Sequence, residues 1–294
     1  MKPFDWYLEP RGWPERTTAY LEGAEQLFVA AAEKALAAAQ LKSGQIDVVV
    51  TVSSTGIATP SLDARVSGRL GFRQDIVRVP VFGLGCAGGV SGLAIASRLA
   101  ESRPGANVLF VAVELCTLAL RLDALTKANI VAISLFGDGA AAAVLRAGDG
   151  GPTQIEASGD HLWPDTLDVM GWNIDPEGFG VILRRTVPQF VTGYLGDALA
   201  KILTGMRLAK TDIGKFICHP GGTKVVAALE DTIGLQAGTL SHERKVLADN
   251  GNMSAPTVLF VLDEAQRAGL PHRSLLTALG PGFTASCISL RHGP

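Results

Sequence analysis

Charged residues are scarce in this chain of 294 residues, at 18% of the composition, and neither sign dominates. The 26 Lys and Arg residues against 28 Asp and Glu give a formal net charge of −2 at pH 7. A face that binds nucleic acid or acidic membranes needs a clear excess of positive charge, so we expect neither partner. The hydrophobic share of 47% is enough for a large buried core, which excludes a disordered chain.

Cysteine is also rare, and its distribution excludes a zinc site. The four cysteines lie far apart, without a CxxC pair or a metal-ligand spacing to histidine; they are Cys86, Cys116, Cys218 and Cys287. We therefore expect no bound metal and a reducing cytoplasm as the compartment of this protein.

An apolar signal sequence is missing from the first residues, MKPFDWYLEPRGW, which carry Asp5 and Glu9. One uncharged stretch, from Val79 to Ser97, is long enough to raise the question of a membrane span. Pro80 and several glycines interrupt this stretch, so we interpret it as a buried strand, a turn and a helix, and we predict no membrane span.

Helical and strand-like segments alternate along the chain. Ala, Leu and Glu dominate from Tyr20 to Leu41 with apolar residues at helical spacing. Ile46 to Val52 follows as a β-branched run, which suits a strand buried on both faces. The same alternation predicts helices over 87–101, 187–203, 223–231 and 254–268, and strands over 107–114, 140–145, 216–219, 275–279 and 284–291.

This alternation is typical of an α/β protein, and it repeats in two similar halves. The Gly-rich segment GDGGP, residues 148–152, separates them. We predict an N-terminal half over residues 1–150 and a C-terminal half over residues 151–294. The chain shows no short-period repeat, which excludes a solenoid.

Cys86 is the candidate nucleophile, because an apolar strand there meets a glycine-rich turn and then a helix, in VFGLGCAGGVSGLAIASRLA. At such a junction the first-turn amides and the helix dipole favour a thiolate, and we expect them to lower the thiol pKa towards neutrality. The alternative is a buried, inert cysteine in a turn packed by glycines. The other three cysteines lie in apolar runs, where the inert interpretation is favoured.

His219 and Asn252 are the candidate partners of Cys86. His219 ends the strand FICH before Pro-Gly-Gly, and the carboxyl ends of strands carry the ligand sites of α/β sheets. An imidazole there could stabilise a thiolate and shuttle protons. Asn252, in DNGNMSAPTVLF, precedes a helix and could project its amide from a loop as a donor; the alternative is an ordinary turn asparagine.

Together, these segments resemble a known family. GCAGG after a strand, FICHPGG after a strand and GNMSA before a helix are similar to the three active-site segments of type III polyketide synthases, the chalcone synthase-like enzymes of the thiolase fold. SLFGDGAAAAV, LGPGFT and STGIATPSLDARV resemble that family's gatekeeper segment, its C-terminal GPG loop and its loop with a dimer-contacting turn. The resemblance runs from about residue 5 to the C-terminus, so it is far stronger than any one motif.

The resemblance implies a thiolase-like α/β fold, in which two similar halves place helices between and around mixed five-stranded sheets. It implies that Cys86 takes an acyl group from a coenzyme A thioester, that His219 holds Cys86 as a thiolate, and that His219 and Asn252 form an oxyanion hole for malonyl-CoA. Decarboxylation then gives an enolate that attacks the acyl-Cys86 thioester, and repeated extension ends in cyclisation. The expected substrates are acyl-CoA and malonyl-CoA, with no cofactor, and the expected assembly is a homodimer.

The resemblance also assigns a substrate cavity, with Phe136 as a gatekeeper between a coenzyme A tunnel and the cavity. Cys116 and Ala119 fall where chalcone synthase-like enzymes have Thr, and Val181 falls at a second gatekeeper position. With the pattern ELCTL, these small apolar residues are closer to bacterial alkylpyrone and alkylresorcinol synthases, and they favour a medium- or long-chain starter at about 0.8 kcal/mol per buried CH2. That Cys116 simply packs a buried strand stays an equal alternative. The remaining expected contacts are Thr55, Gly221, Gly222, Ser254, Gly280 and Pro281.

One departure concerns the N-terminal part, which is longer in family members. This chain begins after the segment expected to supply a first strand, a leading helix and basic residues that contact coenzyme A phosphates. We therefore expect a shortened N-terminal part whose sheet lacks a central strand, with an exposed edge that favours aggregation. Lys224, just after HPGG, is either a substitute phosphate contact or a solvated lysine at a helix start.

Two alternatives to a type III polyketide synthase stay open. A ketoacyl carrier-protein synthase III shares the fold and a Cys/His/Asn set, although CHPGG and GNMSA differ from its expected pattern. The second alternative is a truncated, catalytically inactive subunit that only dimerises with a full-length partner. Intact Cys86, His219 and Asn252 argue against this subunit, and the short N-terminal part argues for it.

Overall fold

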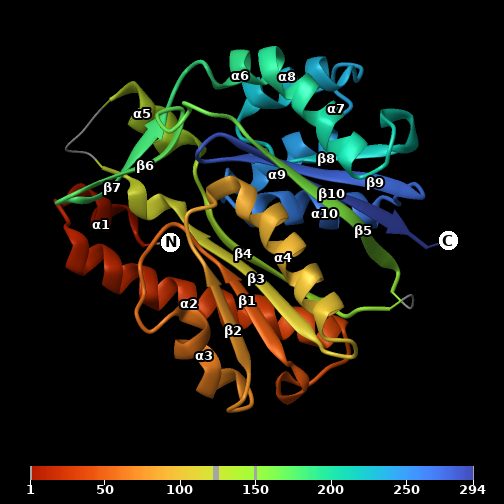
Figure 1. Cartoon of the computed structure of the whole chain (residues 1–294). Coiled ribbons are helices and arrows are strands. Elements are labelled where there is room, and N and C mark those ends of the chain that lie inside the picture. The colour runs from red at the N-terminus through yellow and green to blue at the C-terminus, as the bar shows by residue number, and fades with distance from the viewer. Residues whose placement is uncertain (1, 122–125, 149–150, 294) are drawn as a thin grey trace.

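The computed structural model describes residues 2–121, 126–148 and 151–293 and contains two mixed β-sheets with helices between and outside them (Figure 1). The first sheet has the strand order β2-β1-β3-β4. Its strands are β1 (Val48–Val52), β2 (Val77–Val81), β3 (Val108–Leu115) and β4 (Asp138–Leu145). The first three are parallel, and β4 is antiparallel to β3. β1 and β3 are almost wholly apolar and buried throughout, as strands covered on both faces require.

The second sheet has the order β5-β10-β9-β8. Its strands are β5 (Thr153–Leu162), β8 (Lys215–Cys218), β9 (Arg273–Gly280) and β10 (Thr284–His292). β8 and β9 are parallel, whereas β10 runs antiparallel to both of its neighbours. A separate hairpin joins β6 (Met170–Asp175) to β7 (Gly178–Leu183).

Two helices, α4 (Gly88–Ser102) and α10 (Thr257–Arg267), share one hydrophobic core with both sheets, including Phe110 of β3 and Leu276 of β9. Their small residues explain this close packing. A Cβ on Gly89 would lie 2.2 Å from the Ala255 carbonyl oxygen, so only glycine fits where these segments approach.

Further helices cover the outer faces. α2 (Trp13–Ala38) and α3 (Leu62–Leu70) pack on the first sheet, and α7 (Gly196–Gly205) and α8 (Thr223–Ile233) pack on the second. The other helices are α1 (Phe4–Leu8), α5 (Lys127–Leu135), α6 (Val187–Phe190) and α9 (Ser241–Asn250). Helices thus lie between and around two mixed sheets, as the resemblance implies.

The sheets differ from the expectation in strand number, with four strands each instead of five among the described residues. The expected gap at the centre of the first sheet is also wrong, because β1 and β3 each pair on both sides. Among the described strands, β4 is an edge of the first sheet and pairs with β3 alone. The predicted division near residue 150 falls on residues 149–150, which lie outside the described residues, and stays a prediction.

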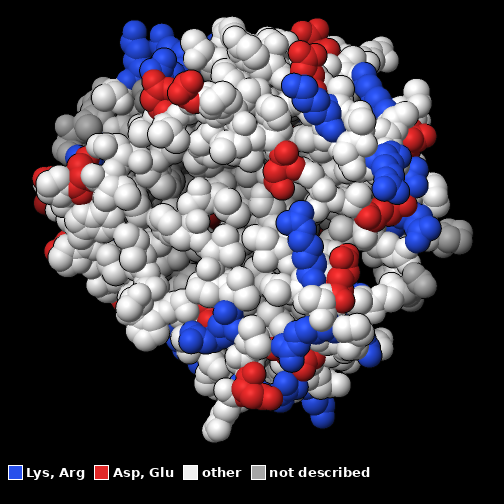
Figure 2. All heavy atoms as spheres, in the orientation of Figure 1, with Lys and Arg blue, Asp and Glu red and all other residues white. Residues whose placement is uncertain are grey.

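The uncharged stretch from Val79 to Ser97 forms the end of β2, a turn and most of α4, in the predicted order. The strand is not buried as predicted, because β2 lies at the edge of its sheet and its residues are half-buried or exposed. Within the described part of the chain, no helix is both long and apolar enough to cross a membrane. Figure 2 shows one face, on which charges of both signs are interspersed along the right and lower edges. This face carries no large area of a single sign, consistent with the balanced composition.

Candidate active site

Cys86 lies in the predicted junction between a strand and a helix. A turn follows β2 and leads into the short 3-10 helix η2 (Gly85–Ala87), which continues directly into α4. Gly83 and Gly85 have φ values of +89° and +48°, so the turn needs the left-handed conformation that glycine adopts without strain. Cys86 is half-buried, whereas the other three cysteines are buried, and all four are free thiols.

Asn252 lies beside Cys86 in the fold. The Cys86 thiol donates to Asn252 Oδ1 across 3.9 Å, and the Ser254 backbone N–H donates to the same oxygen across 2.8 Å. Because both groups hold Oδ1, the Nδ2 donor of the carboxamide is directed away from them. Cys86 and Asn252, candidate residues from the two predicted halves of the chain, therefore lie next to each other.

Phe136 is fixed to Asn252 through the backbone. The two residues form an isolated parallel bridge, in which Asn252 N donates to Leu135 O at 2.7 Å and Gly137 N donates to Asn252 O at 3.0 Å. The Phe136 ring meets the Trp172 ring of the β6-β7 hairpin edge to face, with the centroids 6.2 Å apart. The end of α5 and the hairpin thus lie against the loop that carries Asn252.

His219 follows β8, and its backbone N–H donates to Thr277 O of β9 at 2.8 Å. Its side chain is buried, and neither ring nitrogen has a hydrogen-bond partner in the described residues. β9 ends at Gly280, where a Cβ would lie 2.7 Å from Leu84 O and 2.5 Å from the Ala87 Cβ. The end of the second sheet that bears His219 therefore packs against residues 83–87, the turn that carries Cys86 (the Cys86 turn).

Burial sets the protonation of both side chains. Loss of water around the sulfur raises the pKa of Cys86 to about 11; Ser254 and Asn252 oppose this shift, and the nearby Glu114 carboxyl adds to it. Burial lowers the pKa of His219 to about 4. The expected lowering of the Cys86 pKa is wrong for the protein without substrate, because desolvation outweighs the helix dipole. At pH 7 the pair is a neutral thiol and a neutral imidazole.

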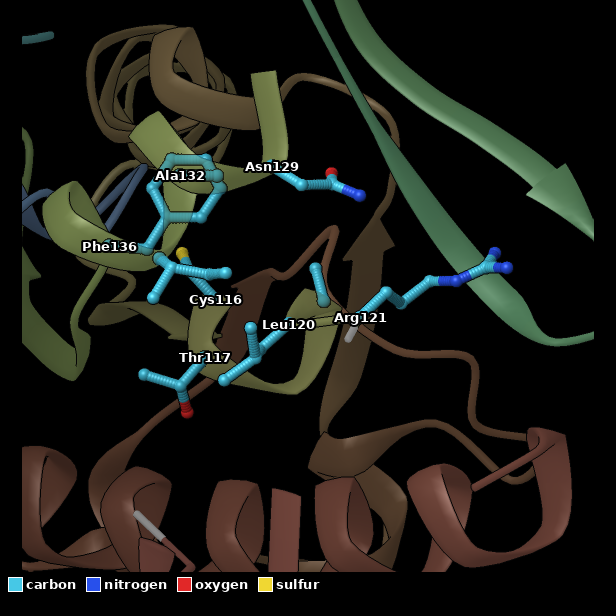
Figure 3. A pocket seen from close by; sticks show the side chains of 9 residues that line it. Cys116, Thr117, Leu120, Arg121, Asn129, Ala132 and Phe136 are labelled. Atoms are coloured by element: carbon cyan, nitrogen blue, oxygen red, sulfur yellow. The ribbon is translucent and has the colours of Figure 1, made fainter. Parts of the chain in front are cut away.

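A pocket adjoins this site, with about 320 Å³ of space counting its opening to solvent. Three of the predicted substrate contacts, Cys116, Ala119 and Phe136, line it, together with Thr117, Leu120, Arg121, Asn129, Ala132 and Ile133. In Figure 3 the Cys116 sulfur and the Phe136 ring lie close together, whereas the Arg121 side chain extends away from them. Arg121 pairs with Asp175 of β6 at 2.6 Å, so its charge is directed to the hairpin and the inner lining is mostly apolar.

The other predicted contact residues have different places. Gly280 and Pro281 touch the Cys86 turn, and a Cβ on Gly222 would lie 3.8 Å from Leu135 beside Phe136. Gly221 N donates to His219 O at 3.0 Å, and Ser254 takes a φ of +60° next to Asn252.

Two predicted contacts lie apart from this pocket. Val181 is on β7 opposite Trp172 and does not line the pocket. Thr55 lines a second, smaller pocket with Trp13 and Phe179, and its hydroxyl donates to Glu114 Oε2 at 2.8 Å.

Glu114 is the residue that sequence reasoning missed. Its side chain is fully buried at the end of β3, and Oε1 has no hydrogen-bond partner among the described residues. Burial raises the pKa of this carboxyl to about 8, so it is largely protonated at pH 7. The sequence feature that could have identified Glu114 is its position as a single acid at the end of the apolar run NVLFVAVE.

Comparison with known families accounts for nearly the whole chain. Residues 14–149 match the N-terminal domain of chalcone and stilbene synthases, and residues 154–293 match their C-terminal domain. A 1,3,6,8-tetrahydroxynaphthalene synthase from Streptomyces peucetius subsp. caesius is 41% identical, over 98% of this chain and 78% of that protein. A putative chalcone synthase from Bacillus subtilis is 35% identical, over 98% of this chain and 83% of that protein.

A solved structure gives the same match in three dimensions. The 1,3,6,8-tetrahydroxynaphthalene synthase of Streptomyces coelicolor, described as a bacterial type III polyketide synthase, superposes with a TM-score of 0.93 at 30% identity. The superposition covers 100% of this chain and 85% of that one.

Proposed function

The chain belongs to the chalcone and stilbene synthase family and is a type III polyketide synthase of thiolase-like fold, and from this premise we propose that Cys86, His219 and Asn252 perform its chemistry. Enzymes of this family act on coenzyme A thioesters without a cofactor. The observation that carries the proposal is the Cys86 thiol 3.9 Å from the anchored Asn252 amide. The buried imidazole of His219, which has no hydrogen-bond partner among the residues the structure describes, supports it.

In the loading step, the neutral His219 imidazole accepts the Cys86 proton as the sulfur attacks the starter thioester carbonyl. The carbon–sulfur bond to coenzyme A breaks, and the departing thiolate takes the proton back from the imidazolium. The products are an acyl-Cys86 thioester, free coenzyme A and a neutral histidine. The pKa values of the two side chains mean that substrate binding, rather than the resting protein, creates the thiolate.

In the extension step, His219 and Asn252 Nδ2 donate to the thioester carbonyl oxygen of malonyl-CoA. When the carboxylate leaves as CO2, its electron pair forms an enolate, and the two donors stabilise the negative charge that develops on the oxygen. The enolate carbon attacks the acyl-Cys86 carbonyl and displaces the sulfur. The chain is two carbons longer and is carried by coenzyme A. The half-buried Phe136 beside Asn252 keeps water from this reaction.

For the starter, we propose a medium- or long-chain acyl-CoA that closes to an alkylpyrone or alkylresorcinol. The pocket lined by Cys116, Ala119 and Ile133 supports this choice, because it adjoins the site and is mostly apolar. Each CH2 buried there adds about 0.8 kcal/mol of binding.

A second candidate product is 1,3,6,8-tetrahydroxynaphthalene, the product named for the relative that is 41% identical. Two-carbon malonyl units alone could supply all carbons of a tetrahydroxynaphthalene. Long acyl chains would then have no role, and the pocket would hold the growing polyketide.

One experiment separates these products. The protein is incubated with labelled malonyl-CoA, alone or with acyl-CoA starters of increasing chain length, and the products are identified by mass. The first proposal predicts alkylated products whose yield rises with chain length, and the second predicts a naphthalene product from malonyl-CoA alone. Absence of any product, with Cys86 no more reactive than the buried cysteines, would support an inactive subunit instead.

We also propose that the protein is a cytoplasmic homodimer. Four free cysteines suit a reducing compartment. Size-exclusion chromatography with light scattering tests the assembly. For a homodimer the measured mass should be about twice the 30.7 kDa of one chain.

A further inference from the structure

The direction of the Cys86 side chain depends on the turn from Gly83 to Gly85, because this turn immediately precedes it. The amide N–H groups of Gly83 and Gly85 both point at one atom, the hydroxyl oxygen of Ser54, at 3.1 and 3.2 Å. A hydroxyl oxygen has two lone pairs, so these two bonds use its full acceptor capacity. The left-handed φ values of both glycines bring the two amides together.

Both backbone polar groups of Ser54 are also hydrogen-bonded. Its backbone N–H donates to Glu114 Oε2 at 2.9 Å, and its carbonyl oxygen accepts from Trp172 Nε1 at 2.8 Å. Only 2% of the residue is exposed. Ser54 is therefore a fixed point that joins β3, the β6-β7 hairpin and the Cys86 turn.

The loop after β9 also packs against the turn. A Cβ on Gly85 would lie 2.6 Å from the Pro281 ring, and a Cβ on Gly280 would lie 2.7 Å from Leu84 O. The contact with Pro281 and the two hydrogen bonds to Ser54 both restrict movement of the turn. The turn is thus held by hydrogen bonds to Ser54 and by packing against the Gly280-Pro281 segment.

We propose that Ser54 is a positioning residue for the nucleophile: its hydroxyl, by accepting both turn amides, fixes the Cys86 thiol beside Asn252. This inference rests on the proposed role of Cys86. Without the hydroxyl, the buried Gly85 amide loses its partner, and the turn can rotate the sulfur away from the reacting carbonyl.

Ser54→Thr and Ser54→Val form the matched test pair, because their side chains have nearly the same shape and only Thr keeps the hydroxyl. Iodoacetamide alkylation of Cys86 is measured across pH by mass spectrometry of its peptide, alongside kcat and KM for malonyl-CoA. Ser54→Val should slow Cys86 alkylation and lower kcat about tenfold, with KM unchanged within about twofold. Ser54→Val should also move the pH profile of Cys86 alkylation to higher pH. Ser54→Thr should restore the alkylation rate, kcat and the pH profile.

Ser274→Ala is the control for loss of a buried hydroxyl, because Ser274 bonds His292 at the far end of β9. It should lower the unfolding temperature without changing the Cys86 alkylation rate. Equal Cys86 alkylation in the Thr and Val variants would overturn the positioning role, even if both are active. If instead Cys86→Ala keeps full synthase activity, the proposed function fails, and alkylation of Cys86 still reports whether Ser54 controls the turn.

Discussion

At the scale of single residues, burial explains the state of the site better than the helix dipole does. Cys86 and His219 are both held in their neutral forms, with pKa values of about 11 and about 4. Desolvation is the main cause in each case. A neutral pair suits an enzyme whose nucleophile must form only when a thioester is bound, because a resting thiolate would be open to oxidation.

Asn252 should matter most in the decarboxylation step. Asn252→Ala removes one oxyanion donor, so release of labelled CO2 from malonyl-CoA should fall about 10²- to 10³-fold. Asn250→Ala is the matched control, since it deletes the same side chain two positions away, where the amide donates to Val246 O of its own helix at 3.2 Å. Unchanged CO2 release in Asn252→Ala would remove Asn252 from the mechanism.

His219 should make the folded protein sensitive to acid. Its pKa is lowered from 6.5 to about 4, so the folded state binds fewer protons than the unfolded state in this range. The stability that follows is fully present above pH 6.5 and is lost as the pH falls towards 4. The unfolding temperature of the protein should therefore fall by several degrees more than that of His219→Gln between pH 7 and pH 4.5. Parallel pH curves for the two proteins would show that this imidazole is not buried as described.

Sequence reasoning identified Cys86, His219 and Asn252 mainly through the resemblance, because their spacing along the chain says nothing about distance in the fold. It could not find Ser54 or Glu114 as partners of the turn. A serine in a polar loop and an acid at a strand end look like solvated groups until tertiary packing buries them.

At the scale of elements, the site depends on close contacts that only small residues allow. The Cys86 turn lies between the loop after β1 and the end of β9, and α4 approaches the segment before α10 through Gly89. These contacts place residues of both sheets at one site.

Gly280→Ala should displace the Cys86 turn, because the new Cβ would lie 2.5 Å from the Ala87 Cβ. Such overpacking costs about 1–3 kcal/mol of stability, and kcat should fall at least about tenfold. Gly68→Ala makes the same change in α3, where nothing lies within 4 Å of the new Cβ.

Gly68→Ala should instead raise stability by about 0.5–1 kcal/mol, because alanine loses less backbone entropy in a helix. Its kcat should stay unchanged. Denaturant unfolding measures the stability of Gly280→Ala and Gly68→Ala, and steady-state kinetics measure their kcat. Equal effects of the two substitutions would contradict the contact at Gly280.

Elements with strong patterns were predicted well whatever their length, and weakly patterned ones were missed. The four-residue β8 was predicted to within one residue, whereas the ten-residue β5 was missed. The β-branched run of β1 and the apolar run of β3 identify buried strands within one or two residues. The predicted helix over 187–203 is instead α6, a π-helical segment at Val191–Leu195 and α7, since Gly193 and Gly196 weaken regular helix there. The β6-β7 hairpin was missed, because its glycines and exposed positions hide the strand alternation.

At the scale of the whole molecule, both sheets share one core. Val50 and Phe110 of the first sheet, Leu276 and Ile288 of the second, and the inner faces of α4 and α10 belong to the same cluster. The proposed catalytic residues Cys86 and His219 follow strands of the first and the second sheet, so the proposed site depends on this core.

Unfolding should therefore be cooperative across both sheets. In a urea titration, tryptophan fluorescence and the alkylation of Cys86 should share one midpoint, as should the alkylation of the buried Cys218. Separate midpoints for Cys86 and Cys218 would show that the two sheets unfold independently, in conflict with the shared core.

The most direct test of the mechanism is the mass of the Cys86 peptide after brief incubation with an acyl-CoA starter in the absence of malonyl-CoA. The account predicts that the acyl group is found on Cys86, that hydroxylamine releases it as a thioester, and that Cys86→Ala carries none while still decarboxylating malonyl-CoA through His219 and Asn252. An acyl group on another residue, or full polyketide formation by Cys86→Ala, would contradict it.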